Sequence, residues 1–159
     1  MFKSTPSPII AFLGFFIFFI AQQNLQAQSK KADAAATTAK NKELVRNIFQ
    51  QAINEKHLGH FDETYAVDVI DHSAYPDQAP GLVGLKKAVG DLLNDIPDLK
   101  VTLQDIIAEG DRVATRETWK GTKKSSGKSG TGNTIHFFII RDNKVTEEWS
   151  QGWDWLEKF

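Results

Sequence analysis

The feature that most constrains the fold is the stretch 134–156, TIHFFIIRDNKVTEEWSQGWDWL, which reads as two strands joined by a tight turn. Residues 135–140 are all apolar or aromatic except His136, a pattern typical of a strand that is buried on both faces. The Asp-Asn-Lys sequence that follows supplies the turn, in which Asn143 can adopt a positive φ. The sequence therefore predicts a β-hairpin close to the C-terminus.

The second strand of this hairpin has an unusual face. Alternation with a period of two places one set of side chains on the same side: Val145, Glu147, Trp149, Gln151 and Trp153. A carboxylate, an amide and two indoles make neither a plain core face nor a plain solvent face. A small-molecule pocket needs this mixture, because bulk desolvates a ligand and a few polar groups orient it.

The N-terminal segment has the pattern of a secretory signal peptide. Lys3 is the only charge before Lys30, and residues 9–21 form an unbroken apolar run. That run is shorter than the roughly 20 residues that span a bilayer, and a polar segment ending near Ala27 follows it. We expect residues 1–28 to be a signal peptide and the mature protein to be periplasmic or secreted, without membrane contact after cleavage. An uncleaved anchor is the alternative.

The rest of the chain predicts one α+β domain. Residues 29–40 carry no large apolar side chain and are expected to form a disordered linker, so that the domain covers residues 41–159. Apolar stripes predict helices over residues 44–53 and 85–93, with a short helix near Asp62 and a short strand at 67–72. Four antiparallel strands follow, and a mobile loop over residues 123–133 separates the middle two. Helices that precede a run of hairpins indicate helices on one face of a curved sheet.

Charge and residue type exclude several classes of function. The formal net charge is −1, so the chain has no basic surface suited to nucleic acid. The absence of cysteine excludes disulfides and a lipid anchor on cysteine. His57 and His60 flank Gly59 without an acidic or cysteine ligand at suitable spacing, so no metal site is expected.

A series of short motifs, taken in order, resembles the SnoaL-like polyketide and ester cyclases of the nuclear transport factor 2-like superfamily. The resemblance covers about residues 41–154. The matching segments are Asp71-His72, GLVGLK at 81–86, PDL at 97–99, AEGDRV at 108–113, WKGT at 119–122, IRDNKV at 140–145 and EEW at 147–149. The resemblance implies a cone-shaped, curved antiparallel sheet wrapped around N-terminal helices, a pocket inside the cone, and a homodimer.

The resemblance also implies ring closure without metal or organic cofactor, with a carboxylate as base. In the family this carboxylate lies four residues beyond the tryptophan that matches Trp149. Here Trp153 occupies that position, and the carboxylate of Asp154 lies five residues beyond Trp149. Residues five apart on a regular strand face opposite sides. A bulge would reverse this, and Gly152 is placed to form one. We therefore expect a break in the strand between Ser150 and Trp153, which turns Asp154 to the same side as Trp149 and Glu147.

The candidate catalytic residues are Asp154 as base, with His72 or His136 as acid or oxyanion donor. Each has a structural alternative: a surface carboxylate for Asp154, a backbone hydrogen bond for His72, and a satisfied buried histidine paired with Glu147 for His136. The candidate substrate-binding residues share large size or a carboxylate in an apolar setting: Trp119, Glu147, Trp149 and Trp153.

The sequence is compatible with three functions. The first is an exported cyclase or isomerase that needs no cofactor and acts on a small, mostly apolar, carbonyl-bearing compound. The second is a non-catalytic binder of such a compound, and the third is a dimeric interaction module whose pocket is vestigial. A buried carboxylate that faces a histidine across an open cavity would favour the first.

Overall fold

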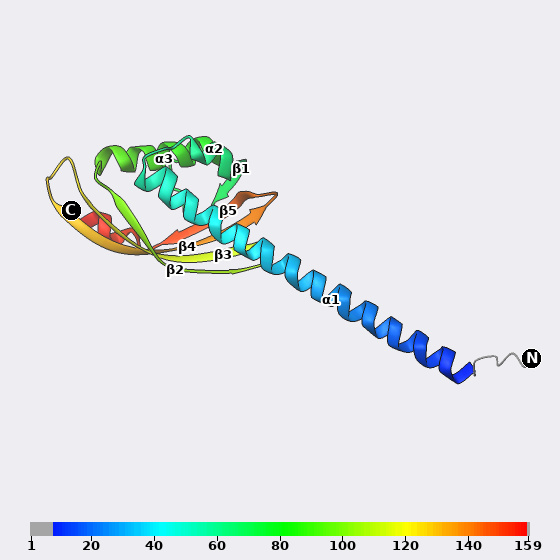
Figure 1. The fold of residues 1–159 in the computed structure, drawn as a ribbon. Helices are drawn as coiled ribbons and strands as arrows, with labels where there is room; N and C mark the ends of the chain where they lie inside the picture. The colour runs from blue at the N-terminus through cyan, green and yellow to red at the C-terminus, as the bar shows by residue number, and fades with distance from the viewer. Residues whose placement is uncertain (1–7, 159) are drawn as a thin grey trace, which may run out of the picture. The chain divides into compact units, whose positions relative to one another are not determined.

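The structure is a computed structural model that describes the backbone of residues 8–158 and the side chains of residues 22–157. Residues 1–7 of the expected signal peptide therefore lie outside the described residues. The chain divides into two compact units, Met1–Ala36 and Thr37–Phe159. Helix α1, Pro8–Asn47, begins in the first unit and ends in the second (Figure 1).

Residues 29–40, expected to be disordered, are helical in the structure. The segment is rich in alanine and lysine, which are among the best helix formers. It also continues directly into the part of α1 that packs in the core, so it can remain helical without a long apolar face of its own. In the part of the chain that the structure describes, no helix combines the length and apolar character needed to cross a bilayer.

The second unit is a five-stranded sheet with helices on one face, as the sequence predicted. The strands are β1 (Tyr65–Asp71), β2 (Lys100–Glu109), β3 (Arg112–Thr122), β4 (Ser129–Arg141) and β5 (Lys144–Gln151), in the spatial order β1-β5-β4-β3-β2. The sheet is mixed and not purely antiparallel, because β1 pairs in parallel with β5. After β1 the chain crosses the face of the sheet as a helix. Three hairpins then lead back across the sheet, so that the last strand, β5, lies beside β1 and runs in the same direction.

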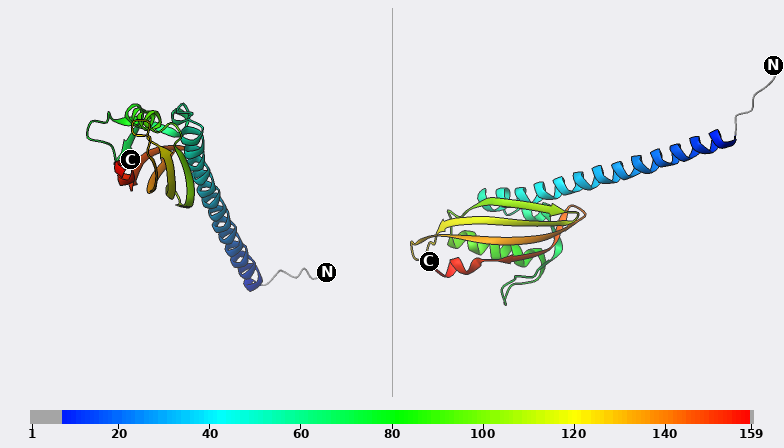
Figure 2. Two further views of the ribbon diagram at one scale, coloured as in Figure 1. Left: turned by 90° about the vertical axis from the view of Figure 1, so that its left-hand side faces the viewer. Right: turned by 90° about the horizontal axis from the view of Figure 1, so that it is seen from below.

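Three helical segments cover the inner face of the curved sheet (Figure 2). They are the π-helical segment η1 (Ile48–Asn54), α2 (His60–Thr64) and α3 (Gly81–Asp95). The predicted apolar stripe of residues 44–53 is buried, and Val45, Ile48, Phe49, Ala52 and Ile53 belong to the core. The helix changes from α-helical to π-helical turns at Ile48, partway along this stripe.

The hairpin β4–β5 turns as predicted but has a different register. Asp142 and Asn143 both have positive φ, 50° and 61°, which gives the tight turn. On the neighbouring rungs Ile140 pairs with Val145 and Ile139 with Glu147, so Thr146 is an extra residue on β5. This bulge reverses the facing of every side chain beyond it.

Strand β4 differs from expectation at its start. The structure has strand from Ser129, paired with Thr122, where a loop was predicted up to residue 133. The early part pairs through its backbone and needs no apolar side chains, which explains why its composition reads as loop. Ile135 is exposed and Phe137 half-buried, so this end of the strand is buried on one face only.

The predicted break at Gly152 is confirmed. Strand β5 ends at Gln151, Gly152 has φ 96°, and the 3₁₀-helix η2 runs over Trp153–Lys158. A Cβ on Gly152 would lie 2.4 Å from the carbonyl oxygen of Asn133, so only glycine fits here without strain. In η2, which follows this break, Trp155 is buried and packs against Gly132.

Candidate functional site

A cavity of about 270 Å³ lies between the inner face of the sheet and the helices. Its walls are mostly apolar and aromatic, with a small set of polar groups, as in typical ligand sites. The polar lining residues are Asp71, Ser73, Tyr75, Gln78, His136, Glu148 and Ser150. Apolar walls come from η1 and α3 and from the rings of Phe61, Tyr65, Trp119, Phe138 and Trp153.

His136 is held in the wall of this cavity by Glu117. Its Nδ1 lies 3.0 Å from Oε2 of Glu117, whose side chain is fully buried. With the carboxylate as acceptor, Nδ1 carries the hydrogen and Nε2 keeps its lone pair in the neutral ring. Nε2 has no hydrogen-bond partner within the described residues. A histidine oriented by a carboxylate, with its second nitrogen free beside a cavity, is equipped to accept a proton.

A buried polar chain behind His136 fixes Glu117. The hydroxyl of Thr134 donates to Oε2 of Glu117 at 2.6 Å and accepts the indole N–H of Trp119, also at 2.6 Å. The second carboxylate oxygen of Glu117 is buried and has no hydrogen-bond partner within the described residues. The position of the histidine therefore depends on a few short contacts between β3 and β4.

Aromatic rings surround the imidazole of His136. The ring of Phe49 is 5.6 Å away, and those of Phe138 and Trp153 are both 5.7 Å away, measured between ring centroids. These rings keep bulk water from the imidazole and strengthen electrostatic interactions at its free nitrogen.

Glu148 is the second polar group of the cavity, and Tyr65 positions it. The hydroxyl of Tyr65 donates to Oε2 of Glu148 at 2.8 Å. Burial raises the pKa of Glu148 to about 7; Asp71 adds to the rise, and His136 and the Tyr65 hydrogen bond oppose it. Burial, and then the negative charge of Glu148, raises the pKa of Tyr65 well above 10. Near neutral pH this carboxyl group can therefore hold or release a proton.

Strand register brings these groups together on the inner face. His136 pairs with Ser150, and Phe138 pairs with Glu148, so the His136 and Glu148 side chains are diagonal neighbours on adjacent strands. Diagonal neighbours on one face of a sheet lie roughly 7–8 Å apart, a distance that a small ligand can bridge. On the other side Asp71 is in register with Glu148.

The loop after β1 closes the end of this polar row. Asp71 accepts the backbone N–H of Ser73 at 2.9 Å and the side-chain amide of Gln78 at 2.8 Å. The hydroxyl of Ser73 donates to the carbonyl of Ser150 at 2.9 Å, and Ser150 accepts the indole N–H of Trp153 at 2.9 Å. These bonds join β1, β5 and η2 around the cavity.

Several residues predicted for the site lie elsewhere, and the two on β5 do so because the bulge at Thr146 turns them outward. Glu147 and Trp149 are not in the cavity lining; Glu148 and Ser150 take their place. Outside the cavity, the imidazole of His72 stacks on Trp149 with ring centroids 3.9 Å apart. His72 also contacts Glu147 at 3.2 Å, and hydrogen bonds from His72 and then Arg141 lower the pKa of Glu147.

Of the other predicted site residues, Trp119, Trp153 and His136 do line the cavity. His136 was expected to pair with Glu147, but its partner is Glu117. Asp154 is exposed and does not line the cavity, so the geometry does not support it as a base. The break at Gly152 starts a helical turn in place of a simple bulge, and strand facing no longer applies to Asp154.

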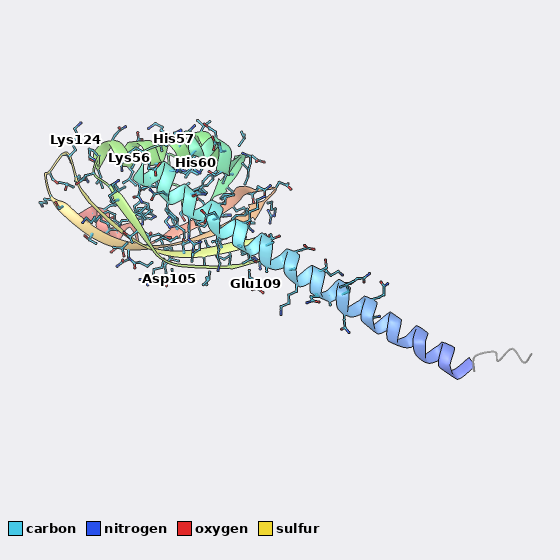
Figure 3. The ribbon with its side chains drawn as sticks, in the orientation of Figure 1. Lys56, His57, His60, Asp105, Glu109 and Lys124 are labelled. Atoms are coloured by element: carbon cyan, nitrogen blue, oxygen red, sulfur yellow. The ribbon has the colours of Figure 1, made fainter. Side chains whose placement is uncertain are left out.

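Among the described residues, no group of three or more histidine, cysteine or carboxylate side chains is placed to hold a metal ion. His57 lies on the connection from η1 to α2 and His60 is the first residue of α2, so both are in the helical layer and apart from the sheet residues Asp105 and Glu109 (Figure 3). His60 contacts Glu63 at 3.3 Å.

Sequence reasoning missed Glu117, Glu148, Tyr65 and the cavity role of Asp71. Glu117 had a usable signal, because it shares with Trp119 and Val113 the alternation that runs into the core. Glu148 had no such signal, because without the pairing register of β4 and β5 the neighbouring Glu147 is an equally good candidate.

Comparison with known proteins identifies the family and the fold. Residues 43–154 match the family model of the SnoaL-like polyketide cyclases, whereas no curated protein sequence matches the chain. Among solved structures, TsrD from Streptomyces laurentii has 23% identity and a TM-score of 0.69, with 76% of this chain and 93% of that chain covered.

Two further structures have the same fold. AclR from Streptomyces galilaeus is 24% identical with a TM-score of 0.66, with 75% of this chain and 93% of that chain covered. A SnoaL-like polyketide cyclase from Agrobacterium tumefaciens is 18% identical with a TM-score of 0.60, with 72% and 93% covered. On the family match over most of the folded unit, the chain belongs to the SnoaL-like polyketide cyclase family.

Proposed function

We propose that the protein catalyses proton transfer on a small, mostly apolar, carbonyl-bearing compound, in a cyclisation or isomerisation. The observation that carries the proposal is the buried contact between Glu117 and His136 at the wall of an apolar cavity. Such a pair can accept a proton from a bound compound without a bound metal or organic group.

In the proposed reaction Nε2 of His136 removes a proton from the carbon next to the carbonyl group. Glu117 accepts the N–H of Nδ1 and stabilises the imidazolium that forms. The surrounding rings hold the substrate and exclude water, so that the intermediate formed by this proton removal reacts within the cavity. The resulting nucleophilic carbon can add to a second carbonyl of the same molecule, which closes a ring, or can be reprotonated at another position, which isomerises it.

Deuterium exchange into 2-tetralone, a bicyclic ketone with an acidic methylene group, tests this proposal. The wild-type protein should accelerate exchange at that methylene, and His136→Gln should lose about 100-fold of the acceleration, the usual contribution of a positioned base. Glu117→Gln should lose most of it as well. His57→Gln, an exposed histidine outside the cavity, is the matched control and should behave as wild type.

A non-catalytic binder is the competing function. It would bind 2-tetralone in the cavity, and exchange would be no faster with wild type than with His136→Gln, which would overturn the catalytic proposal. Mass spectrometry of compounds that copurify with the chain would then identify the ligand.

Export is a separate part of the proposal, supported by the apolar run at residues 9–21 and the polar segment after it. The mature protein from its native host should begin between residues 22 and 30. An intact Met1 on the native protein would contradict export with cleavage.

A further inference from the structure

We propose that Glu148 binds the carbonyl oxygen of the ligand through a proton on its Oε1, and that Tyr65 holds the carboxyl group in the orientation this requires. The inference rests on the proposed function only in taking the ligand to be a carbonyl compound. It assigns a binding role to a residue that the proton-abstracting pair does not include.

The two oxygens of Glu148 have different surroundings. Oε2 accepts the Tyr65 hydroxyl at 2.8 Å, so this oxygen acts as the acceptor end of the carboxyl group. Oε1 has no hydrogen-bond partner within the described residues, although Glu148 is only 8% exposed and lines the cavity. A protonated carboxyl has a single O–H donor. With Oε2 occupied by a donor, that O–H lies on Oε1, the oxygen open to a ligand.

The setting of Glu148 favours the protonated form. Asp71 stands beside it in register on β1, and no lysine or arginine lines the cavity to neutralise two carboxylates. Besides Asp71, the titratable groups that face Glu148 are Tyr65, His136 and, from the loop after β1, Tyr75; η1 and α3 present only apolar side chains. Two adjacent carboxyl groups in an apolar cavity do not both ionise easily, so one keeps its proton.

This placement complements the base. His136 and Glu148 project from adjacent strands as diagonal neighbours on the inner face, so a ligand oxygen at Glu148 brings the neighbouring carbon towards His136. When Nε2 takes the proton, the C–H bond breaks and its electron pair forms the C=C bond of the enol. The π pair of the carbonyl moves to oxygen, which takes the proton from Oε1. Imidazolium and carboxylate remain, and both reset when the protons return.

A matched pair of neutral probes separates this hydrogen bond from simple apolar binding. Acetophenone and α-methylstyrene have nearly the same shape, and only the ketone can accept a hydrogen bond. Neither has a group that ionises between pH 5.5 and 8.5. Their affinities for the full chain can be measured across this range by ligand-observed NMR.

Acetophenone should bind more weakly as pH rises through about 7, because the donor is lost when Glu148 ionises. One hydrogen bond corresponds to roughly a five- to tenfold loss of affinity. The affinity for α-methylstyrene should stay constant. Glu148→Gln should remove the pH dependence for the ketone, and Glu147→Gln, which changes the outward-facing neighbour, should preserve it.

Tyr65→Phe gives a second readout that does not depend on how well Glu148→Gln folds. The Tyr65 hydrogen bond favours the ionised carboxylate, so its loss should move the acetophenone midpoint to higher pH. A pH-independent affinity for acetophenone in wild type would overturn the proposal. So would tight binding of 1-phenylethylamine that strengthens through pH 7, since Glu148 would then act as a carboxylate that binds cations. Ketone binding with the expected profile but without deuterium exchange would contradict only the proposed catalysis.

Discussion

Replacing Thr134 with valine tests the buried polar chain that positions the catalytic pair. Valine has nearly the shape of threonine, so the substitution removes the hydroxyl without opening a cavity. Thr134 is 1% exposed, and its hydroxyl is the acceptor for Trp119 and a donor to Glu117, each at 2.6 Å.

The expected cost follows from what is left unpaired. The indole N–H of Trp119 loses its acceptor in a site that is 2% exposed, which costs about 1–3 kcal/mol. Glu117 loses one of the two donors on Oε2, and its other oxygen has no hydrogen-bond partner within the described residues, which adds about 1 kcal/mol. The total is about 3 kcal/mol, or a fall in Tm of about 10 °C for a unit of this size.

Urea unfolding followed by tryptophan fluorescence measures this loss. Thr131→Val is the matched control, because Thr131 is an exposed residue on the same strand; the free energy of unfolding should change by less than about 0.5 kcal/mol. If Thr134→Val is as stable as that control, the hydrogen-bonded chain contributes little and the reasoning about Glu117 is wrong. Tryptophan emission should also shift, since Trp119 is the donor that loses its partner.

Three further predictions concern stability and assembly. The pKa of Glu148 in the folded protein, about 7, is above the ordinary value of 4.5. The contribution of Glu148 to the free energy of unfolding is therefore complete below pH 4.5, and it falls by up to about 3 kcal/mol as pH rises through 7. Urea unfolding at several pH values should show this fall in wild type but not in Glu148→Gln. Gly132→Ala should destabilise the fold, because the added Cβ would lie 1.9 Å from Cγ of Trp155. Gly90→Ala, in helix α3 and with its added Cβ 3.4 Å from Leu58, should stabilise the fold by about 0.5–1 kcal/mol. Thermal unfolding checks both, and a Tm that rises for Gly132→Ala or falls for Gly90→Ala would contradict the prediction. The outer face of the sheet should form a homodimer, and a monomeric mass by light scattering at tens of micromolar would refute this.

Much of the fold could be predicted because local chemistry and tertiary structure agree. The apolar stripe of residues 44–53, the turn at Asn143 and the break at Gly152 each use a residue suited to one conformation. The strand segment at residues 129–133 could not be predicted from composition, because backbone pairing with β3 holds it in place and apolar side chains do not.

The site was predicted less well because it depends on register. A bulge at Thr146 needs no special residue type, yet it replaces Glu147 by Glu148 on the inner face. The partner of His136 was missed for a related reason: Glu117 reaches it across the β3–β4 register, which the sequence does not contain. By contrast, Trp119 and Trp153 were placed correctly as cavity walls.

A crystal structure of the full chain soaked with 2-tetralone tests the catalytic cavity most directly. We expect the ketone inside the cone, with its oxygen within hydrogen-bond distance of Oε1 of Glu148 and its acidic methylene roughly 3–3.5 Å from Nε2 of His136, the geometry of a near-attack complex. A ketone bound on the outer face beside Trp149, or a cone interior filled by protein side chains, would contradict a catalytic cavity centred on His136.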